Sequence, residues 1–527
     1  MTLLRNRSGR SRHLYHRPVI SRVHSFVLQG IDAVPCEIEV DLYPSETPRT
    51  SIVGLPDAAV RESIQRVRAA ISNSGFHAPR SCATINLAPA SIRKEGPVYD
   101  LPIAVALLQS GGTIRPPDGN SVTGVDEYLI AGEVALDGRL RPIRGAISLA
   151  QLAGTLGKRG VIVPRENAAE AAVVDKIEVL GATCLSEVVA MFNGCGTIEP
   201  HPWVDMESLI AEARPEIDFS DVRGQETAKR AITIAAAGGH NLLMIGPAGT
   251  GKTMMARALP GILPPLSRAE AVEVTRIYSS VGRLARRQPL KALRPVRTPH
   301  HTASGAAIIG GGTVPRPGEV SLAHRGVLFL DELPEFSRDV LETLRQPLED
   351  GTVTIARAHS SVTFPARFML VAAMNPTPRG GMPDDEVSRQ AMDRYLAKLS
   401  GPLIDRIDIH IEVPAVAYRQ LNAARRGTDT ATMRARVLAA RKLQEQRQGP
   451  ALTNAALSGR KLDRFAALDE AADLVLGQAM TELGLSARAY DKIRRVARTI
   501  ADLDASPTVQ SHHVAEAVRY RLLDRRR

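Results

Sequence analysis

The residues best suited to chemistry form a glycine-rich loop over 246–253, which reads Gly-Pro-Ala-Gly-Thr-Gly-Lys-Thr. The loop follows the mostly apolar run 241–245 and precedes a helix-prone segment, which is the order that a phosphate-binding P-loop requires. Its glycines let successive N–H groups point at phosphate oxygens, at the positive end of the helix. An ordinary glycine-rich turn is the alternative, but every fixed position of the motif is filled. The predicted nucleotide-binding residues are Gly246, Pro247, Ala248, Gly249, Thr250, Gly251, Lys252 and Thr253.

Polar residues at the ends of two apolar runs are expected to complete this site. The run 327–330 ends in Asp331 and Glu332, and the run 368–374 ends in Asn375. Fully apolar runs are typical of parallel strands that are buried on both faces. We expect Lys252 to reach the β- and γ-phosphates and Thr253 to hold Mg²⁺ together with Asp331.

Glu332 has the chemistry of a base that polarises the attacking water, and the neutral amide of Asn375 can orient that water. Either carboxylate could instead be an incidental helix start. The P-loop upstream favours the catalytic interpretation.

Composition sets broad limits on the chain. With 527 residues, 44% of them hydrophobic, the chain should form two to four domains. No apolar run approaches the ~18–20 residues that span a bilayer, so we expect no membrane segment. The four cysteines (Cys36, Cys82, Cys184 and Cys195) lie far apart, which favours free thiols over disulfides or zinc.

The formal net charge of +11 favours a polyanionic partner, although solubility alone explains such a charge equally well. Aromatic residues make up only 4% of the chain, so any nucleic-acid contact should be mostly electrostatic rather than base stacking.

The pattern along the chain predicts an α/β protein of several parts. Residues 1–20 read as a basic, disordered extension; a nucleic-acid arm or a start codon placed too early are alternatives. Residues 21–195 alternate strands and helices, and the proline-containing segment 196–216 reads as a linker. Residues 217–415 hold the P-loop domain, and 416–527 are helical by pattern.

The N-terminal α/β region resembles the proteolytic domain of Lon. The resemblance lies in Lys-Glu-Gly-Pro-Val-Tyr-Asp-Leu-Pro over 94–102 and in the segment 131–143. The position of the Lon nucleophile is Val98, and the general-base lysine should fall at 146–148, where the central residue is Ile147. Neither side chain can do Ser–Lys chemistry. The resemblance therefore implies a Lon-like (S5-like) domain without protease activity, serving as a scaffold or a substrate-binding module.

Three further segments resemble parts of AAA+ ATPases. Residues 218–225 resemble the segment that opens AAA+ modules, where Val222 would contact adenine. Residues 400–408 resemble the arginine-finger segment of the magnesium-chelatase group, which implies that Arg406 enters a neighbour's site. Residues 485–493 resemble the sensor-2 helix of that group, with Arg488 contacting phosphate; the C-terminal region would then be a helical lid.

Both arginine assignments have alternatives. Arg406 could form a salt bridge within the chain, with Asp405 or Asp408. Arg488 shares its helix with other arginines, which are Arg494, Arg495 and Arg498.

Over roughly residues 21–525 the chain resembles the ComM/YifB family of magnesium-chelatase-like ATPases. The insert 254–325 is longer than a minimal crossover needs, and its segments 299–304 and 310–324 carry the resemblance together with 333–336 and 344–349. The resemblance implies a cytoplasmic bacterial AAA+ hexamer that uses ATP and Mg²⁺. It further implies a DNA motor that drives branch migration of incoming single-stranded DNA during natural transformation.

We expect sequence-independent DNA contacts from the glycine loop 310–312 and from Arg294, Arg297 and Arg316, projecting towards a central pore. The alternatives are a chelatase motor for metal insertion, a protein-remodelling motor, a regulatory ATP-binding scaffold and an ATP-dependent protease. The Lon-like region argues against a dedicated chelatase motor.

Two local features qualify the resemblance. The pair His300 and His301 has no carboxylate or cysteine at ligand spacing, so we expect backbone capping or nucleotide sensing rather than metal binding. Many family members have Asn-Pro-Cys-Pro-Cys after the sensor-1 asparagine, whereas this chain reads Asn-Pro-Thr-Pro-Arg-Gly over 375–380. Any zinc-like cross-link that those cysteines make is missing here.

Overall fold

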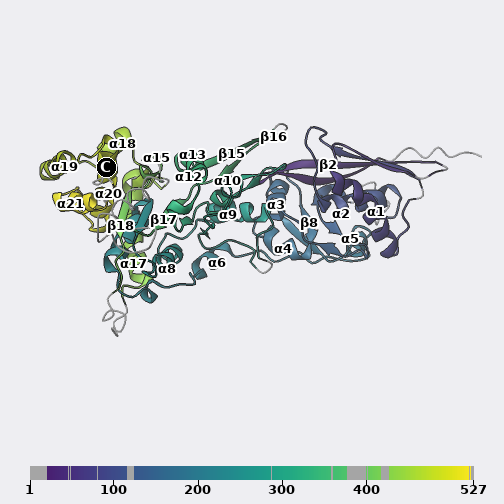
Figure 1. Ribbon diagram of the computed structural model, residues 1–527. Coiled ribbons are helices and arrows are strands. Elements are labelled where there is room, and N and C mark those ends of the chain that lie inside the picture. Colours follow the sequence, from purple (N-terminus) through teal and green to yellow (C-terminus); the bar gives the residue numbers. More distant parts are fainter. Residues whose placement is uncertain are drawn as a thin grey trace, which may run out of the picture. The chain divides into compact units, whose positions relative to one another are not determined.

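The computed structural model describes residues 20–45, 47, 49–79, 81–115, 124–285, 288–357, 360–376, 399, 401–416, 427–450, 452–521 and 523. By packing, the chain divides into two compact units (Figure 1). The N-terminal unit comprises Met1–Val204 with Ala285–Pro289, and the C-terminal unit comprises Asp205–Leu284 with Leu290–Arg527. Residues 1–19 of the basic extension predicted for 1–20, and residues 377–380, lie outside the described residues.

The N-terminal unit is built on a mixed seven-stranded sheet, in the order β3-β4-β2-β1-β5-β8-β9. The β1–β2 and β2–β4 pairs are antiparallel, and the other pairs are parallel. The period-two pattern predicted for residues 36–42 is confirmed, because Cys36, Ile38 and Val40 are buried in β2. The strands of this sheet are β1 (Ser21–Gln29), β2 (Asp32–Tyr43), β3 (Thr50–Val53), β4 (Cys82–Ala88), β5 (Tyr128–Ile130), β8 (Gly160–Pro164) and β9 (Glu178–Ala182).

Helices cover both faces of this sheet. One core contains side chains of α1, α2 and α5 with Val23 and Val27 of β1, and a second contains α3 and α4 with Phe26 of the same strand. Since successive residues of a strand point to opposite faces, the two helix groups lie on opposite sides. The helices are α1 (Ala58–Asn73), α2 (Asp100–Ser110), α3 (Ala146–Thr155), α4 (Arg165–Ala171) and α5 (Leu185–Phe192), and a small hairpin is β6 (Glu133–Val134) with β7 (Leu140–Arg141).

Part of the predicted linker belongs to the N-terminal unit. Pro200 forms a bridge with Leu180 of β9, and the His201 N–H donates to the carbonyl of Val179 at 2.8 Å. The helix α6 (Met206–Glu212) then opens the C-terminal unit, with Asp205 as its N-cap.

The C-terminal unit holds a five-stranded parallel sheet in the order β11-β14-β17-β10-β18. Every residue of β10, β14 and β17 is buried, as their apolar runs predict. Because β17 lies between β10 and β14, the carboxyl ends of these three strands meet at one edge of the sheet. This arrangement is consistent with an AAA+ P-loop α/β fold. The strands are β10 (Leu242–Ile245), β11 (Val296–Arg297), β14 (Val327–Leu330), β17 (Met369–Met374) and β18 (Ile409–Glu412).

Helices and two small hairpins surround this sheet. Helix α7 precedes β10 and α8 follows the P-loop, while the rest come from the insert and from the segment after β14. The helices are α7 (Glu226–Gly238), α8 (Lys252–Ala258), α9 (Arg268–Ser280), α10 (Gly305–Ile309), α11 (Glu319–Leu322), α12 (Arg338–Thr343), α13 (Arg345–Asp350) and α15 (Gly401–Ile404). The hairpins pair β12 (Gly310–Gly311) with β13 (Arg316–Pro317) and β15 (Thr352–Arg357) with β16 (Ser360–Pro365).

The C-terminal residues are helical, as their pattern predicts. Helix α20 is amphipathic, with one apolar and one charged face, and it packs against both α7 and α17. The helices are α17 (Thr430–Gln448), α18 (Gly459–Phe465), α19 (Glu470–Glu482), α20 (Ala487–Leu503) and α21 (Ser511–Arg519). None of the helices among the described residues has both the length and the apolar character to cross a membrane.

A buried polar network fastens these helices to the sheet. Asp502 accepts hydrogen bonds from Arg447 at 2.7 and 2.8 Å, and His240 lies between Asp408 at 3.2 Å and Thr499 at 2.8 Å. Burial raises the pKa of Asp408, but the hydrogen bond and charge of His240 and the charges of Lys492 and Arg495 together outweigh burial and hold that pKa at about 2. The network therefore ties α17 and α20 to the amino end of β18.

Candidate nucleotide site

The P-loop lies between the carboxyl ends of β17 and β18. The Gly246 N–H donates to the carbonyl of Met374 at 3.1 Å, and a Cβ at Gly246 would lie 2.1 Å from the Val413 carbonyl oxygen. Gly249 and Gly251 have φ of +77° and +89°, in the left-handed region that glycine adopts readily. Backbone geometry thus requires glycine at three of the motif positions.

Lys252 begins α8 and is 7% exposed. Its Nζ donates to the carbonyls of Gly246 at 2.6 Å and Pro247 at 2.8 Å, and to Oδ1 of Asn375 at 3.4 Å. Burial lowers the pKa of the Lys252 amine, and the charge of Asp331 partly opposes this shift. The structure therefore brings together Lys252 and Asn375, the residue predicted as sensor 1, which the sequence placed on separate elements.

Thr253 and Asp331, the predicted Mg²⁺ residues, are in direct contact. The Thr253 hydroxyl donates to Oδ2 of Asp331 at 2.8 Å. A hydroxyl oxygen and a carboxylate oxygen are hard ligands, of the kind that Mg²⁺ prefers. The donor set therefore fits the metal.

Glu332 follows Asp331 with a φ of +52°, which is uncommon for a residue other than glycine. Its N–H donates to Oδ1 of Asp331 at 3.0 Å, and its Oε2 lies 3.3 Å from Nδ1 of His301. Strained backbone of this kind is found preferentially at functional sites. The sequence did not reveal the contact with His301, because 31 positions separate the two residues.

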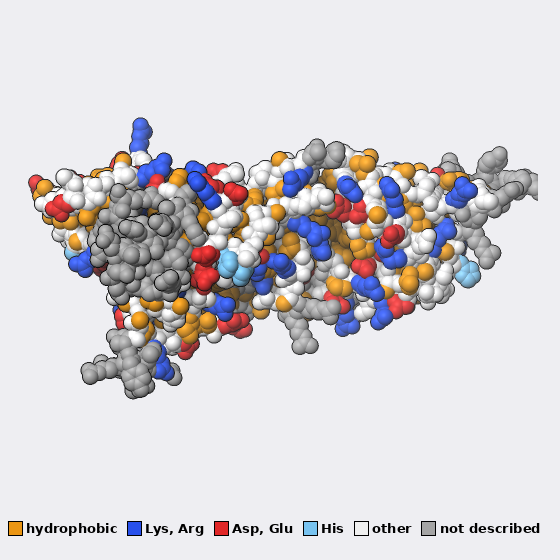
Figure 2. Space-filling model, viewed as in Figure 1, with side chains coloured by type: hydrophobic (Ala, Val, Ile, Leu, Met, Phe, Trp, Pro, Cys, Tyr) orange, Lys and Arg blue, Asp and Glu red, His pale blue; other side chains and the backbone are white. Residues whose placement is uncertain are grey.

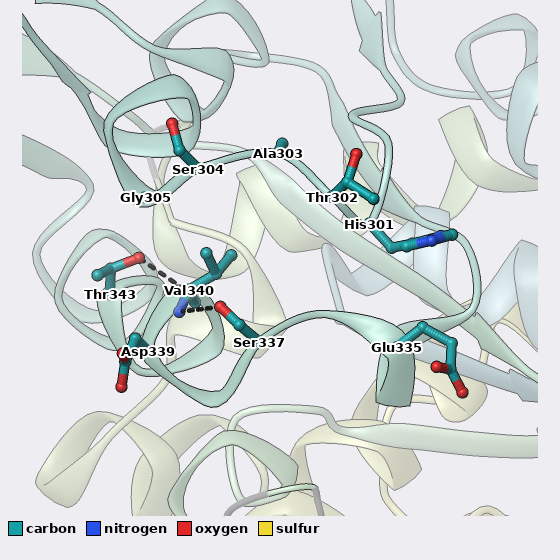
Figure 3. Close-up of a pocket in the computed structure, with 10 residues that line it drawn as sticks. All are labelled: His301, Thr302, Ala303, Ser304, Gly305, Glu335, Ser337, Asp339, Val340 and Thr343. Atoms are coloured by element: carbon teal, nitrogen blue, oxygen red, sulfur yellow. Dashed lines mark hydrogen bonds between the residues drawn. The ribbon is translucent and has the colours of Figure 1, made fainter.

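His301 lines a groove of about 520 Å³ (Figure 3). The groove is lined by members of two segments, residues 301–305 and residues 335–343, which include hydroxyl and carboxylate side chains. His300 stacks on His301 with ring centroids 4.2 Å apart, and Nδ1 of His300 accepts the Thr302 N–H at 3.3 Å. His300 therefore caps the backbone and holds His301 beside Glu332.

Val222 lies next to the P-loop. It is 3% exposed, and its Cγ1 would lie 3.8 Å from a Cβ at Gly251. Phe219, three residues before Val222, is hydrogen-bonded to the first residue of α17: its N–H donates to the Thr430 hydroxyl at 2.8 Å. The opening segment thus places Val222 beside the P-loop.

The backbone of Arg406 lies at the amino ends of the parallel strands, whereas the P-loop of the same chain lies at their carboxyl ends. The Arg406 carbonyl accepts from the Asn241 amide at 2.8 Å, and Asn241 precedes β10 whereas the P-loop follows it. A strand of four residues separates the two positions by roughly 13 Å. Nη1 of Arg406 donates to the Pro402 carbonyl at 2.6 Å, and Nη2 is ion-paired with Glu349. An internal salt bridge exists, but its partner is neither Asp405 nor Asp408.

Arg488 lies beside this segment. Its Nη1 donates to Oδ2 of Asp405 at 3.0 Å, and its side chain is 74% exposed. Arg494 and Arg498 of the same helix are largely buried and paired with Asp463 and Asp502. Arg488 is therefore more accessible to a phosphate than Arg494 or Arg498.

The prediction that Arg294 and Arg297 project outwards to hold DNA is wrong. Arg297 is bound to Glu319 at 2.5 and 2.9 Å, and this hydrogen bond raises the pKa of Arg297. Arg294 donates to the carbonyls of Pro264 and Arg325 at 2.6 and 2.7 Å. Both hold the insert together.

Arg316 is exposed on β13, as its predicted role requires. Arg357 of β15, which no sequence motif singled out, donates its Nε–H to the Gly312 carbonyl at 3.2 Å. The alternating pattern of residues 352–357 was the signal that could have placed it on a hairpin.

Comparisons with known proteins cover nearly the whole chain. Residues 218–421 match the family described as "Magnesium chelatase, subunit ChlI", residues 38–167 match "Subunit ChlI of Mg-chelatase", and residues 427–521 match its C-terminal family. "Uncharacterized protein YifB" of Salmonella typhimurium is 44% identical, over 95% of this chain and 97% of that protein. "Competence protein ComM" of Haemophilus influenzae is 43% identical over the same shares.

A more distant relative matches a smaller part. The "Magnesium-chelatase 38 kDa subunit" of Cereibacter sphaeroides is 27% identical, over 44% of this chain and 74% of that protein. The matches to ComM and YifB, by contrast, extend through both units. The chain belongs to the ComM/YifB family of magnesium-chelatase-like AAA+ proteins.

Proposed function

We propose that this protein is an ATP-hydrolysing motor that acts on DNA, with ATP sites shared between neighbouring copies. The observation that carries the proposal is the cluster of Lys252, Thr253, Asp331 and Asn375 within hydrogen-bonding contact at one sheet edge. Its second support is that Arg406 and Arg488 lie together, away from the P-loop of their own chain.

The residues of the cluster have distinct roles in hydrolysis. Thr253 and Asp331 hold Mg²⁺, which neutralises charge on the β- and γ-phosphates when bound. Lys252 stabilises the charge that develops on the transferred phosphoryl group. Asn375 orients the attacking water, and Glu332 accepts its proton. Val222 contacts the adenine.

The arginines imply a homo-oligomer. An arginine that cannot reach its own P-loop completes a site only in another copy, as an arginine finger supplied in trans does. We propose a closed ring, a hexamer, in which Arg406 and Arg488 face the ATP of the next subunit, with α17–α21 serving as the helical lid.

Two hairpins are the proposed DNA contact: β12–β13, which lies in the insert, and β15–β16. Gly312 and Arg316 are exposed, and Arg357 joins the two hairpins through the Gly312 carbonyl. Basic side chains on the face in Figure 2 are scattered among acidic ones, so the net charge of +11 alone does not locate a patch on that face. Contacts to phosphate would be independent of sequence and sensitive to salt.

The relative named "Competence protein ComM", at 43% identity, supports a role in competence. We propose single-stranded or branched DNA as the substrate and branch migration of incoming DNA as the activity. Work on chromosomal DNA also implies a cytoplasmic location. Metal insertion or protein remodelling by a chelatase-like motor is the second candidate, favoured by the match to the 38 kDa magnesium-chelatase subunit.

Proteolysis is disfavoured by the residues of the N-terminal unit. The buried Ile147 donates its N–H to Oε1 of Glu170 at 3.0 Å, and Val98 has no nucleophilic atom. Nearby, Asp100 is bound to Arg66 at 3.1 Å; burial raises the pKa of Asp100, and the hydrogen bonds from Arg66 and Ser63 oppose this shift. We propose a scaffold role for this Lon-like unit.

The proposal is tested by measuring ATP hydrolysis with single-stranded, duplex and forked DNA, using Lys252→Ala to exclude contaminating ATPases. Stimulation by at least one form of DNA is expected. If no DNA changes the rate of an active enzyme, the chelatase-like or protein-remodelling motor becomes the better assignment.

Replacing Arg316 and Arg357 together by alanine is expected to weaken DNA binding roughly tenfold at moderate salt. Two phosphate contacts are lost, so the slope of log affinity against log salt should fall by about 2. Fluorescence anisotropy of labelled DNA measures both quantities. Arg460→Ala, at an exposed arginine of α18, is the control. Unchanged affinity in a double variant of normal oligomeric state would exclude these hairpins as the contact.

A further inference from the structure

Both arginines assigned to a neighbour's ATP are held by carboxylates of their own chain. Arg406 is 16% exposed and paired with Glu349, which is 60% exposed at the end of α13. Arg488 is paired with Asp405 at 3.0 Å. Since Asp405 directly precedes Arg406, the two ion pairs form one surface, which we call the arginine patch: Glu349, Asp405, Arg406 and Arg488.

The backbone beneath the patch is fixed by buried hydrogen bonds. Asn241 donates to the carbonyl of Arg406 at 2.8 Å, and Arg521 donates to that of Ile407 at 2.7 Å. His240 holds the side chain of Asp408 at 3.2 Å. Any change in what the arginines contact must therefore come from their side chains.

Phosphate and carboxylate compete for a guanidinium group. Both are recognised by its planar fork of N–H donors, and both bonds are strengthened by charge. Nη1 and Nη2 of Arg406 are already occupied, by Pro402 and Glu349. A γ-phosphate that approaches Nη2 therefore meets the carboxylate of Glu349 at the same nitrogen, and the two anions repel each other and compete for it.

We propose that the arginine patch is the surface that docks onto the ATP-loaded face of a second copy of this chain, and that Glu349 and Asp405 are internal caps exchanged for phosphate on docking. The inference rests on the proposed function, in which Arg406 and Arg488 complete a neighbour's site. Beyond that function, Glu349 and Asp405 are the groups that oppose assembly. Without nucleotide in the neighbour, each arginine keeps its cap and the surface offers that neighbour no unpaired cation.

The caps should make assembly depend more strongly on nucleotide. The ion pairs are partly exposed, so breaking each one costs little, and removing a cap should shift the equilibrium only a few-fold. The shift should appear when nucleotide is bound and vanish without it, because only phosphate competes with the cap.

The test is sedimentation velocity of the full chain over a range of protein concentrations, with and without a non-hydrolysable ATP analogue and Mg²⁺. Glu349→Gln and Asp405→Asn are each expected to lower the concentration at half-assembly roughly two- to fivefold with the analogue. No shift is expected without it. Glu342→Gln, which removes the partner of Arg345 at 2.7 Å, is the matched control. Thermal unfolding verifies that each variant is folded.

An unchanged or higher midpoint for either cap variant would overturn the proposal, since it would mean that the carboxylate is neutral or helps to aim its arginine. Arg406→Ala separates this outcome from failure of the proposed function. If that variant assembles with the analogue as the unmodified protein does, the shared ATP site itself is wrong. If it assembles poorly while the cap variants are unchanged, only the caps are wrong.

Discussion

Replacing Lys252 by alanine is expected to lower the turnover number for ATP by at least ~10²-fold, because a preorganised charge at the transferred phosphoryl group is lost. The geometry supports a role confined to the site: Lys252 is bound to the loop carbonyls of Gly246 and Pro247 and to Asn375. Steady-state phosphate release and binding of a fluorescent ATP analogue measure the loss of turnover and of affinity separately.

The matched control is Lys461→Ala, at an exposed lysine of α18. It removes the same charge and should leave turnover unchanged. Turnover by Lys252→Ala within a few-fold of the unmodified protein would show that the P-loop is not the hydrolytic site.

Replacing Glu332 by glutamine is expected to lower turnover by ~10²–10⁴-fold, the usual contribution of a general base. Glutamine keeps the shape and can still accept a hydrogen bond from His301, but it cannot accept a proton. ATP should therefore bind, remain unhydrolysed and stabilise the oligomer. Nucleotide retained after gel filtration and the size of the complex are the measurements.

Glu335→Gln is the control, because Glu335 lies three residues further on and lines the groove of Figure 3. Its turnover should be close to that of the unmodified protein. Hydrolysis at the unmodified rate by Glu332→Gln would remove Glu332 from its assigned role.

The site residues that could be predicted from the sequence lie within a short motif or directly after an apolar run. The P-loop is a contiguous motif, and Asp331 and Asn375 follow apolar runs that become buried parallel strands. The carboxyl ends of parallel strands lie at the same end of a sheet, so the proximity of these residues followed from the apolar runs that precede them. The order of the strands, with β17 between β10 and β14, then places Asn375 within reach of Lys252.

Pairing between side chains from distant segments was not predictable. Arg297 was expected to be free for DNA, yet it is bound to Glu319. Arg406 is paired with Glu349, 57 positions away, rather than with the acids beside it in sequence. A charge pattern shows which side chains carry charge but not which partner the fold supplies.

The N-terminal unit illustrates a different limit. Its strands were largely evident from alternation, as in β2, but prolines in 196–216 suggested a free linker where Pro200 and His201 contact β9. Proline blocks one donor without preventing a carbonyl or a neighbouring N–H from joining a sheet edge.

Coupling of ATP hydrolysis to movement on DNA can be measured as strand displacement on a branched DNA with one labelled strand. Release of the labelled strand is expected with ATP and Mg²⁺, and none is expected with Lys252→Ala or with a non-hydrolysable analogue. Normal ATP hydrolysis without strand movement on any single-stranded, forked or four-way substrate would show that the protein is not a DNA motor.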